Sequence, residues 1–166
     1  MLARREARVE RRRDVLACHG RPVVSLTLVT PGPVKDTADA RFVFGVAVAA
    51  IRGLLADGGL PVAIVEERLL ATGPEALIVV AADPRVLKRL LVGLEEGHPL
   101  GRLWDVDVVA PDGHGIGRAA LGLPARACLV CAEPAHACAR ARRHPLGELQ
   151  RAIAEKIDAY RRGPAH

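Results

Sequence analysis

Two aspartates separated by a single residue stand in the segment GRLWDVDVV, residues 101–109. In a β-strand, residues two apart point to the same side of the sheet, so Asp105 and Asp107 are predicted to project together while Trp104 and Val106 pack on the other side. Paired carboxylates suit Mg²⁺, which prefers oxygen ligands and commonly binds through one or two carboxylates together with substrate phosphates. The pair indicates transfer chemistry at phosphorus; the alternative is an edge strand that carries two solvated acids.

A glycine and a lysine follow the first expected strand, in the turn Pro31-Gly-Pro-Val-Lys35. Gly32 permits close approach of a ligand to the backbone, and Lys35 can reach a phosphate as a point charge. The Walker pattern is absent, so the residues alone also fit a proline-stiffened turn with a surface lysine. Glu66 or Glu75 could complete a metal site, and either is equally compatible with a solvated charge.

Three cysteines and a histidine lie close together near the C-terminus. Cys128, Cys131, Cys138 and His144 form the ligand set of a structural zinc site, with His136 as a competing fourth ligand. The six residues between the second and third cysteines differ from the common finger spacings. The alternatives are therefore bound zinc or reduced, half-buried thiols, because a cytoplasmic protein is not expected to hold disulfides.

Several elements must position these residues. Hydrophobic periodicity, caps and turn residues predict a helix over 2–17, a strand over 22–30, a helix from Thr37 to Gly58, strands over 62–70 and 76–82, a helix that begins at Asp83-Pro84, a strand over 103–109, a short segment over 116–121, and an amphipathic C-terminal helix with Leu146, Leu149, Ile153 and Ile157.

The central order of these elements is strand, helix, strand, strand, helix, strand. It predicts an α+β fold with an antiparallel or mixed sheet and helices on one face, either ferredoxin-like or nucleotidyltransferase-like. We expect one domain over residues 1–166, with an N-terminal helix at 1–20, an α/β core at 22–121 and a Cys/His/Arg-rich C-terminal helical appendage at 124–166.

Composition narrows the class of partner. The 166 residues include 24 basic and 19 acidic side chains, a formal charge of +5, which favours an anionic partner. Only two Phe, one Tyr and one Trp could stack on bases, so single-stranded nucleic acid is not favoured. No apolar run reaches the length of a membrane helix and the first residues lack a secretory signal, so we expect a cytoplasmic protein without membrane contact.

Four segments, taken together, resemble one family. They are 25–35 (SLTLVTPGPVK), 72–76 (TGPEA), 98–108 (HPLGRLWDVDV) and 126–144, which contains the cysteines and arginines. In order and spacing they are similar to the citrate lyase holo-acyl-carrier-protein synthases, the apo-citrate lyase phosphoribosyl-dephospho-CoA transferases. Val29-Thr30 departs from the asparagine-containing pair of many relatives.

The resemblance implies a nucleotidyltransferase-type reaction. A serine hydroxyl of the citrate lyase acyl carrier protein, the gamma subunit, would react with 2′-(5″-triphosphoribosyl)-3′-dephospho-CoA and release diphosphate. Asp105 and Asp107 would then hold Mg²⁺, while Lys35 and Arg102 would hold outer phosphate oxygens. Either aspartate, or His98, could accept the serine proton.

Further residues are predicted to bind substrate, the arginines among them because both the donor and an acidic carrier call for cations. They are Gly32, Glu75, Arg140, Arg142 and Arg143, and the three arginines could contact either the donor or an acidic carrier protein. Two rival readings stay open: a related transferase that serves malonate decarboxylase, and a zinc-stabilised nucleic-acid-binding module, which explains the C-terminal segment alone.

Overall fold

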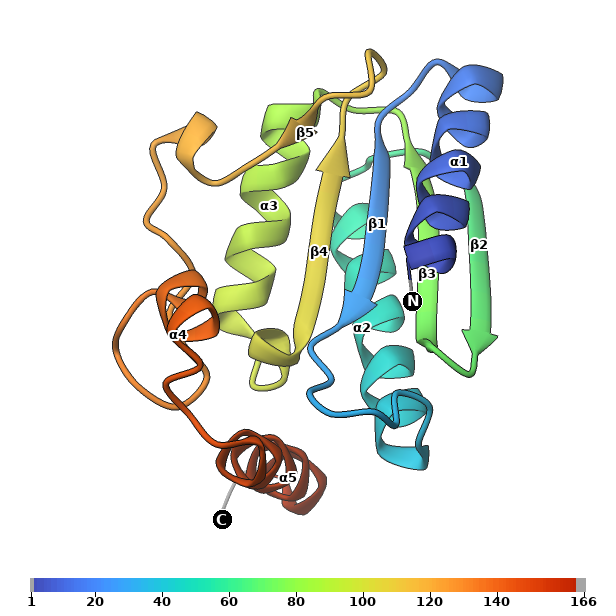
Figure 1. Ribbon diagram of the computed structural model, residues 1–166. Helices are drawn as coiled ribbons and strands as arrows, with labels where there is room; N and C mark the ends of the chain where they lie inside the picture. Colours follow the sequence, from blue (N-terminus) through green and yellow to red (C-terminus); the bar gives the residue numbers. More distant parts are fainter. Residues whose placement is uncertain (1, 164–166) are drawn as a thin grey trace.

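A computed structural model of the chain describes residues 2–163 (Figure 1). Its helices and strands follow the expected order. They are α1 (Leu2–His19), β1 (Val23–Leu28), α2 (Ala38–Asp57), β2 (Val62–Leu70), β3 (Gly73–Val80), α3 (Pro84–Gly97), β4 (Trp104–Val109), β5 (Gly115–Ile116), α4 (Ala135–Ala141) and α5 (Leu146–Arg162), with short 3₁₀ helices at Gly101–Leu103 and Ala119–Leu121.

The strands form one five-stranded sheet in the order β2-β3-β1-β4-β5. Every neighbouring pair is antiparallel, so of the two expected sheet types the antiparallel one is observed. β1 lies between β3 and β4, with Ser25 opposite both Leu77 and Asp107. Because β3 and β4 both run antiparallel to β1, their corresponding ends lie at the same edge of the sheet, although the two strands are distant in sequence.

Local signals fix the two central helices. Thr37 caps α2 by accepting a hydrogen bond from the Ala40 N–H, and Gly58 follows its last turn. Asp83 caps α3 in the same way, and Pro84 occupies the first turn, where its missing N–H costs nothing. Both helices begin where the sequence predicts.

The main core lies between the sheet and the helices α2 and α3. Alternate strand residues face it, among them Leu26, Ile78, Trp104 and Val106, all nearly inaccessible to solvent. The other face of the sheet is partly covered by α1, whose Leu16 packs on a smaller cluster from β1, β3 and β4. Figure 1 shows α1 and α2 on opposite sides of the sheet.

The expectation of helices on one face is therefore right for α2 and α3 and wrong for α1. The reason is that the strands carry residues such as Leu77 on the second face, and these need a cover as well.

Residues beyond β5 run past the end of the sheet where β1 ends (Figure 1). Apart from the 3₁₀ helix at Ala119–Leu121, a bridge between Ala127 and Pro134 and the short helix α4, the stretch before α5 has little regular structure. α5 returns to the body of the protein and buries Ile157 in the main core. Among the described residues, no helix is long and apolar enough to cross a membrane.

Candidate active site

The two aspartates of β4 lie side by side on the face of the sheet that α1 partly covers. Trp104 and Val106 are buried on the opposite face, and Asp105 and Asp107 are accessible to solvent. Thr27 is the neighbour of Asp105 on β1, and its hydroxyl donates to Asp105 Oδ2 at 3.4 Å. The predicted convergence of the two carboxylates on one face is confirmed.

Burial and a neighbouring carboxylate both act on Asp107. Partial burial raises the pKa of Asp107, and the nearby charge of Asp105 raises it further. Asp107 also lines a shallow pocket of about 290 Å³ with Arg12 of α1 and the glycines Gly115 and Gly117. A cation bound between the two carboxylates would relieve their repulsion.

Arginines of α1 reach the same face of the sheet. Arg8 Nε donates to Glu75 Oε2 at 2.7 Å, and Arg11 Nη2 donates to Glu75 Oε1. Burial alone would raise the pKa of Glu75, but the hydrogen bonds from Arg11 and Arg8 outweigh it and hold this pKa below its usual value. Both oxygens of Glu75 are thus engaged by α1, which joins that helix to β3.

Arg126 connects the aspartates to the C-terminal segment. Its Nη2 donates to Glu95 Oε1 at 2.8 Å and to the carbonyl of Trp104, and its Nη1 lies 3.6 Å from Asp105 Oδ1. Glu95 is buried in α3 and also pairs with Arg118 at 3.1 Å. The guanidinium of Arg126 is therefore fixed beside Asp105 at the start of β4.

A larger pocket of about 440 Å³ adjoins this arginine. Its wall is mostly apolar, with residues from the loop after β1, from α4 and from the start of α5, and it is also lined by Arg102, Arg126 and Arg142. Nε and Nη1 of Arg102 are buried with no hydrogen-bond partner among the described residues. Burial lowers the pKa of Arg102, and the charge of Arg126 lowers it further. An apolar pocket that contains the unpartnered nitrogens of Arg102 suits a ligand that combines an apolar part with an anion.

The other predicted residues are spread more widely. Gly32, at a φ of 93°, lies against Leu146 and Gln150 of α5, and Lys35 donates to the carbonyl of Thr30. Of the three tail arginines, Arg142 lines the larger pocket, whereas Arg140 and Arg143 are exposed and do not.

His98 lies on the opposite side of the sheet from the aspartates. Its ring stacks beside Trp104 at 4.5 Å and Tyr160 at 5.4 Å, and its Nδ1 accepts a hydrogen bond from the Leu100 N–H. Burial lowers the pKa of His98. The surroundings of this ring are those of a packed side chain.

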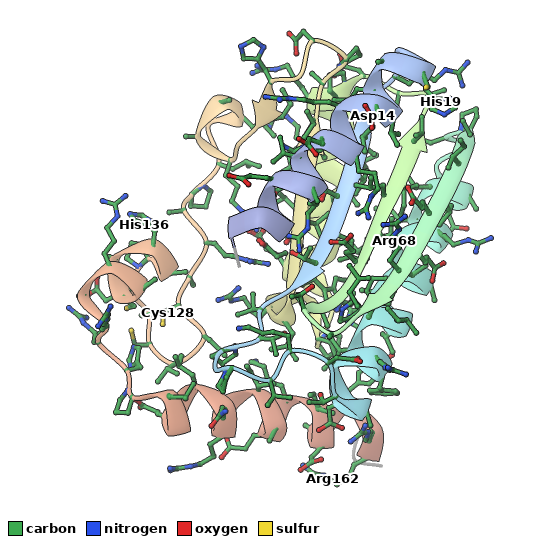
Figure 2. All side chains as sticks on the ribbon, turned by 45° about the vertical axis from the view of Figure 1, so that its right-hand side comes forward. Asp14, His19, Arg68, Cys128, His136 and Arg162 are labelled. Atoms are coloured by element: carbon green, nitrogen blue, oxygen red, sulfur yellow. The ribbon has the colours of Figure 1, made fainter. Side chains whose placement is uncertain are left out.

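The predicted zinc ligands come together. Donor atoms of Cys128, Cys131, Cys138 and His144 all lie within 4.8 Å of one another. Figure 2 shows His136 on the outer side of α4, directed away from Cys128, so the structure gathers His144 and not His136 with the sulfurs.

The ionisable groups of this cluster differ in the direction of their pKa shifts. Burial opposes ionisation of Cys128, but backbone N–H groups of Val130 and Cys131 outweigh it and lower the pKa of Cys128 to about 6. Burial, and then the neighbouring sulfurs, raise the pKa of Cys138 to about 12. The hydrogen bond with Cys131 is the main cause that raises the pKa of His144. These shifts favour a thiolate at Cys128, close to Cys138 and His144, which hold their protons more firmly than usual.

Sequence reasoning missed Arg12, Thr27, Arg126 and Glu148. Thr27 could have been found, because a threonine two residues after Ser25 on a predicted strand points to the same face. Glu148 stands four positions after His144, in the first turn of α5, and its carboxylate lies 3.1 Å from the His144 ring. In the sequence, nothing separates Arg12 and Arg126 from the many other arginines, and only their contacts in the structure distinguish them.

Comparison with known proteins gives one family. The profile of the apo-citrate lyase phosphoribosyl-dephospho-CoA transferases matches residues 1–160. Relatives of that name from Escherichia coli and from Shigella boydii serotype 18 are each 40% identical to this chain over 162 residues, which cover 96% of this chain and 88% of the relative. The match extends over the aspartate pair, the arginine pocket and the cysteine cluster alike. This chain therefore belongs to the apo-citrate lyase phosphoribosyl-dephospho-CoA transferase family.

Proposed function

We propose that the protein transfers the 5-phosphoribosyl-3′-dephospho-CoA group from 2′-(5″-triphosphoribosyl)-3′-dephospho-CoA to a serine of the citrate lyase acyl carrier protein. The serine oxygen attacks the phosphorus nearest the ribose, the bond from that phosphorus to the bridging oxygen breaks, and diphosphate leaves. The serine proton passes to a base on the protein or to water. The observation that carries this proposal is the contact of Arg126 with Asp105, which joins the carboxylate pair to a pocket that contains the unpartnered nitrogens of Arg102.

The residues around Asp105 fit a Mg²⁺ ion. Two carboxylates and the hydroxyl of Thr27 offer hard oxygen atoms on one face of the sheet, which are the ligands that Mg²⁺ prefers. When bound there, Mg²⁺ would neutralise charge on the reacting phosphates. Asp105 and Asp107 would hold it, and its remaining positions would be left to water and substrate oxygens.

Arginines supply the rest of the charge. Arg102 and Arg126 would bind oxygens of the departing diphosphate, because their guanidinium groups face the pocket and present several N–H donors in a fixed geometry. The apolar wall of this pocket would cover the uncharged part of the CoA-like donor. An aspartate is the better candidate for the proton acceptor than His98, since His98 packs on the other face of the sheet.

The finer assignment of the fold and the cellular location belong to the same proposal. The order β2-β3-β1-β4 with antiparallel neighbours supports a ferredoxin-like core. A cytoplasmic location remains a prediction.

The decisive experiment follows the mass of the acceptor. Apo-carrier protein is incubated with the enzyme, the triphosphoribosyl donor and Mg²⁺, and intact-mass spectrometry is expected to find the carrier increased by one prosthetic group. Asp105→Asn and Asp107→Asn should each lower the rate by at least about 100-fold with little change in stability.

Asp112→Asn is the matched control. Asp112 lies in the turn after β4 with its side chain 67% exposed, and its replacement should leave the rate unchanged. Near-normal rates for both Asp105→Asn and Asp107→Asn would refute the metal site. Modification of the malonate decarboxylase carrier in place of the citrate lyase carrier would keep the chemistry and change the acceptor.

A further inference from the structure

The cysteine cluster has the dimensions of a metal site. Cys131 Sγ lies 3.5 Å from Cys138 Sγ and 3.3 Å from His144 Nε2. In a tetrahedral zinc site with Zn–S bonds of about 2.3 Å and a Zn–N bond of about 2.0 Å, two sulfurs lie about 3.8 Å apart and a sulfur lies about 3.5 Å from the nitrogen. These two separations match the edges of such a tetrahedron to within a few tenths of an ångström, and all four donor atoms lie within 4.8 Å of one another.

The backbone around the first two cysteines is shaped to stabilise thiolates. N–H groups of Val130 and Cys131 are directed to Cys128 Sγ, and the N–H of Glu133 is directed to Cys131 Sγ. The turn that makes this possible is closed by the Cys128 N–H, which donates to the carbonyl of Glu133 at 2.7 Å. Such donors compensate negative sulfur, which is the form that binds metal.

A carboxylate orients the histidine. His144 Nδ1 lies 3.1 Å from Glu148 Oε2, one turn further along in α5. With the ring proton on Nδ1 and donated to this carboxylate, the lone pair of Nε2 faces the sulfur of Cys131. Histidines that bind metals very commonly donate their second ring nitrogen to a carboxylate in this way.

Disulfide formation does not account for the arrangement. The distance of 3.5 Å between the sulfurs of Cys131 and Cys138 is far from the bond length of about 2.05 Å, and all the described cysteines are free. A packed apolar cluster does not account for it either, because Cys138 alone is buried while Cys128 and Cys131 remain partly accessible.

We propose that Cys128, Cys131, Cys138 and His144 bind one structural Zn²⁺ ion in a closed tetrahedral site, with Glu148 as the residue that orients His144. The ion joins three pieces of chain: the turn at 128–133, helix α4 and the segment just before α5. It thereby holds the wall of the arginine pocket, to which Cys128, Cys138 and His144 themselves contribute. The geometry of the four ligands supports the metal site by itself. Only the role of the ion in holding the wall of the arginine pocket rests on the proposed function.

The test measures metal before it measures activity. Protein purified with reductant and without chelator should contain about one zinc per chain by elemental analysis. Replacement of zinc by Co²⁺ should give the visible absorption of tetrahedral cobalt and the near-ultraviolet band of thiolate bound to cobalt. Glu148→Gln should weaken zinc binding by about 10- to 100-fold while leaving all four ligands in place.

Two pairs of variants make the assignment specific. Cys138→Ser should lose the zinc, whereas Cys18→Ser, at an exposed cysteine of α1, should retain it. His144→Ala should bind zinc weakly, whereas His136→Ala should bind it like wild type. Should Cys138→Ser fail to fold, the cobalt spectrum of the wild type and the Glu148→Gln titration still decide the question.

Absence of zinc from the reduced wild-type protein, together with no cobalt spectrum on addition of Co²⁺, would overturn the proposal. Full zinc content in both Cys138→Ser and His144→Ala would overturn it as well. Transfer to the carrier is assayed separately, so that a zinc-containing protein with no transfer activity would refute the proposed function and leave the metal site intact.

Discussion

Glu75→Gln tests whether α1 is fastened to the sheet by the carboxylate of Glu75. In the wild type, the Glu75 side chain is 6% exposed and pairs with Arg8 and Arg11, whose side chains are 30% and 19% exposed. A hydrogen bond to a charged group contributes about 1.5 to 3 kcal/mol, and the partial exposure of both arginines reduces this through solvent screening. Glutamine keeps one acceptor oxygen but turns an NH₂ group toward the second guanidinium, so we expect a loss of about 2 kcal/mol.

The assay is thermal unfolding combined with hydrogen exchange. For a chain of this size a loss of 2 kcal/mol lowers Tm by about 4 to 8 °C, and the amides of α1 should exchange faster while those of β1 stay protected. Glu66→Gln is the matched control, because Glu66 is 32% exposed and lies 3.9 Å from Arg11, and we expect it to cost less than about 1 kcal/mol.

The effect should depend on pH with a definite sign. Because the folded-state pKa of Glu75 is lowered, its stabilisation is fully present above the unfolded value of about 4.3 and disappears as the pH falls through the lower folded value. Wild type and Glu75→Gln should therefore differ at pH 7 and converge in acid. A variant that melts within about 1 °C of wild type at pH 7, with equal protection of α1, would refute this account of how α1 is held.

Two further predictions concern the pocket and the approach to β4. Arg102→Ala should raise the KM for the donor by about 10- to 100-fold without lowering Tm, since Arg102 has buried nitrogens that lack a hydrogen-bond partner among the described residues. Arg140→Ala, at an exposed residue, should leave the KM for the donor unchanged. Steady-state kinetics with varied donor concentration distinguishes the two variants. Gly101→Ala should destabilise the fold by about 3 kcal/mol or more, because a Cβ there would lie 2.1 Å from the Glu95 carbonyl oxygen. In the control Gly147→Ala the added Cβ has no neighbour among the described residues within 4 Å, so Tm should stay unchanged or rise. Equal Tm values for the two variants in calorimetry would contradict this prediction.

The features predicted correctly from sequence depend on near neighbours in the chain. Thr37 and Asp83 cap their helices through groups two or three residues away, so the start of each helix can be read locally. The alternation at Asp105 and Asp107 is a property of one strand. The cysteine cluster was predicted because its four members fall within 17 consecutive residues, 128–144.

The features that sequence reasoning missed depend on residues far apart in the chain. Arg11 meets Glu75 across 64 positions, and Arg126 meets Glu95 across 31, and no spacing rule relates such pairs. The position of α1 on the second face was missed for the same reason, since its sequence shows many arginines whose partners lie on other elements. Arg102 was assigned to phosphate binding by resemblance, but its lack of a hydrogen-bond partner could only be found once its neighbours were in place.

The contacts of Arg126 and Ile157 bear on how the chain could be shortened. A cut before residue 124 would remove one of the two guanidinium partners of buried Glu95, leave the carbonyl of Trp104 without its arginine, and expose the part of the main core that Ile157 covers. The sequence predicts an appendage over the last forty or so residues, yet these residues complete the main core. A truncated protein that ends at 123 should therefore be insoluble or molten, and a hybrid that exchanges this segment with that of a distant relative would need a matching change at buried Glu95 to stay folded.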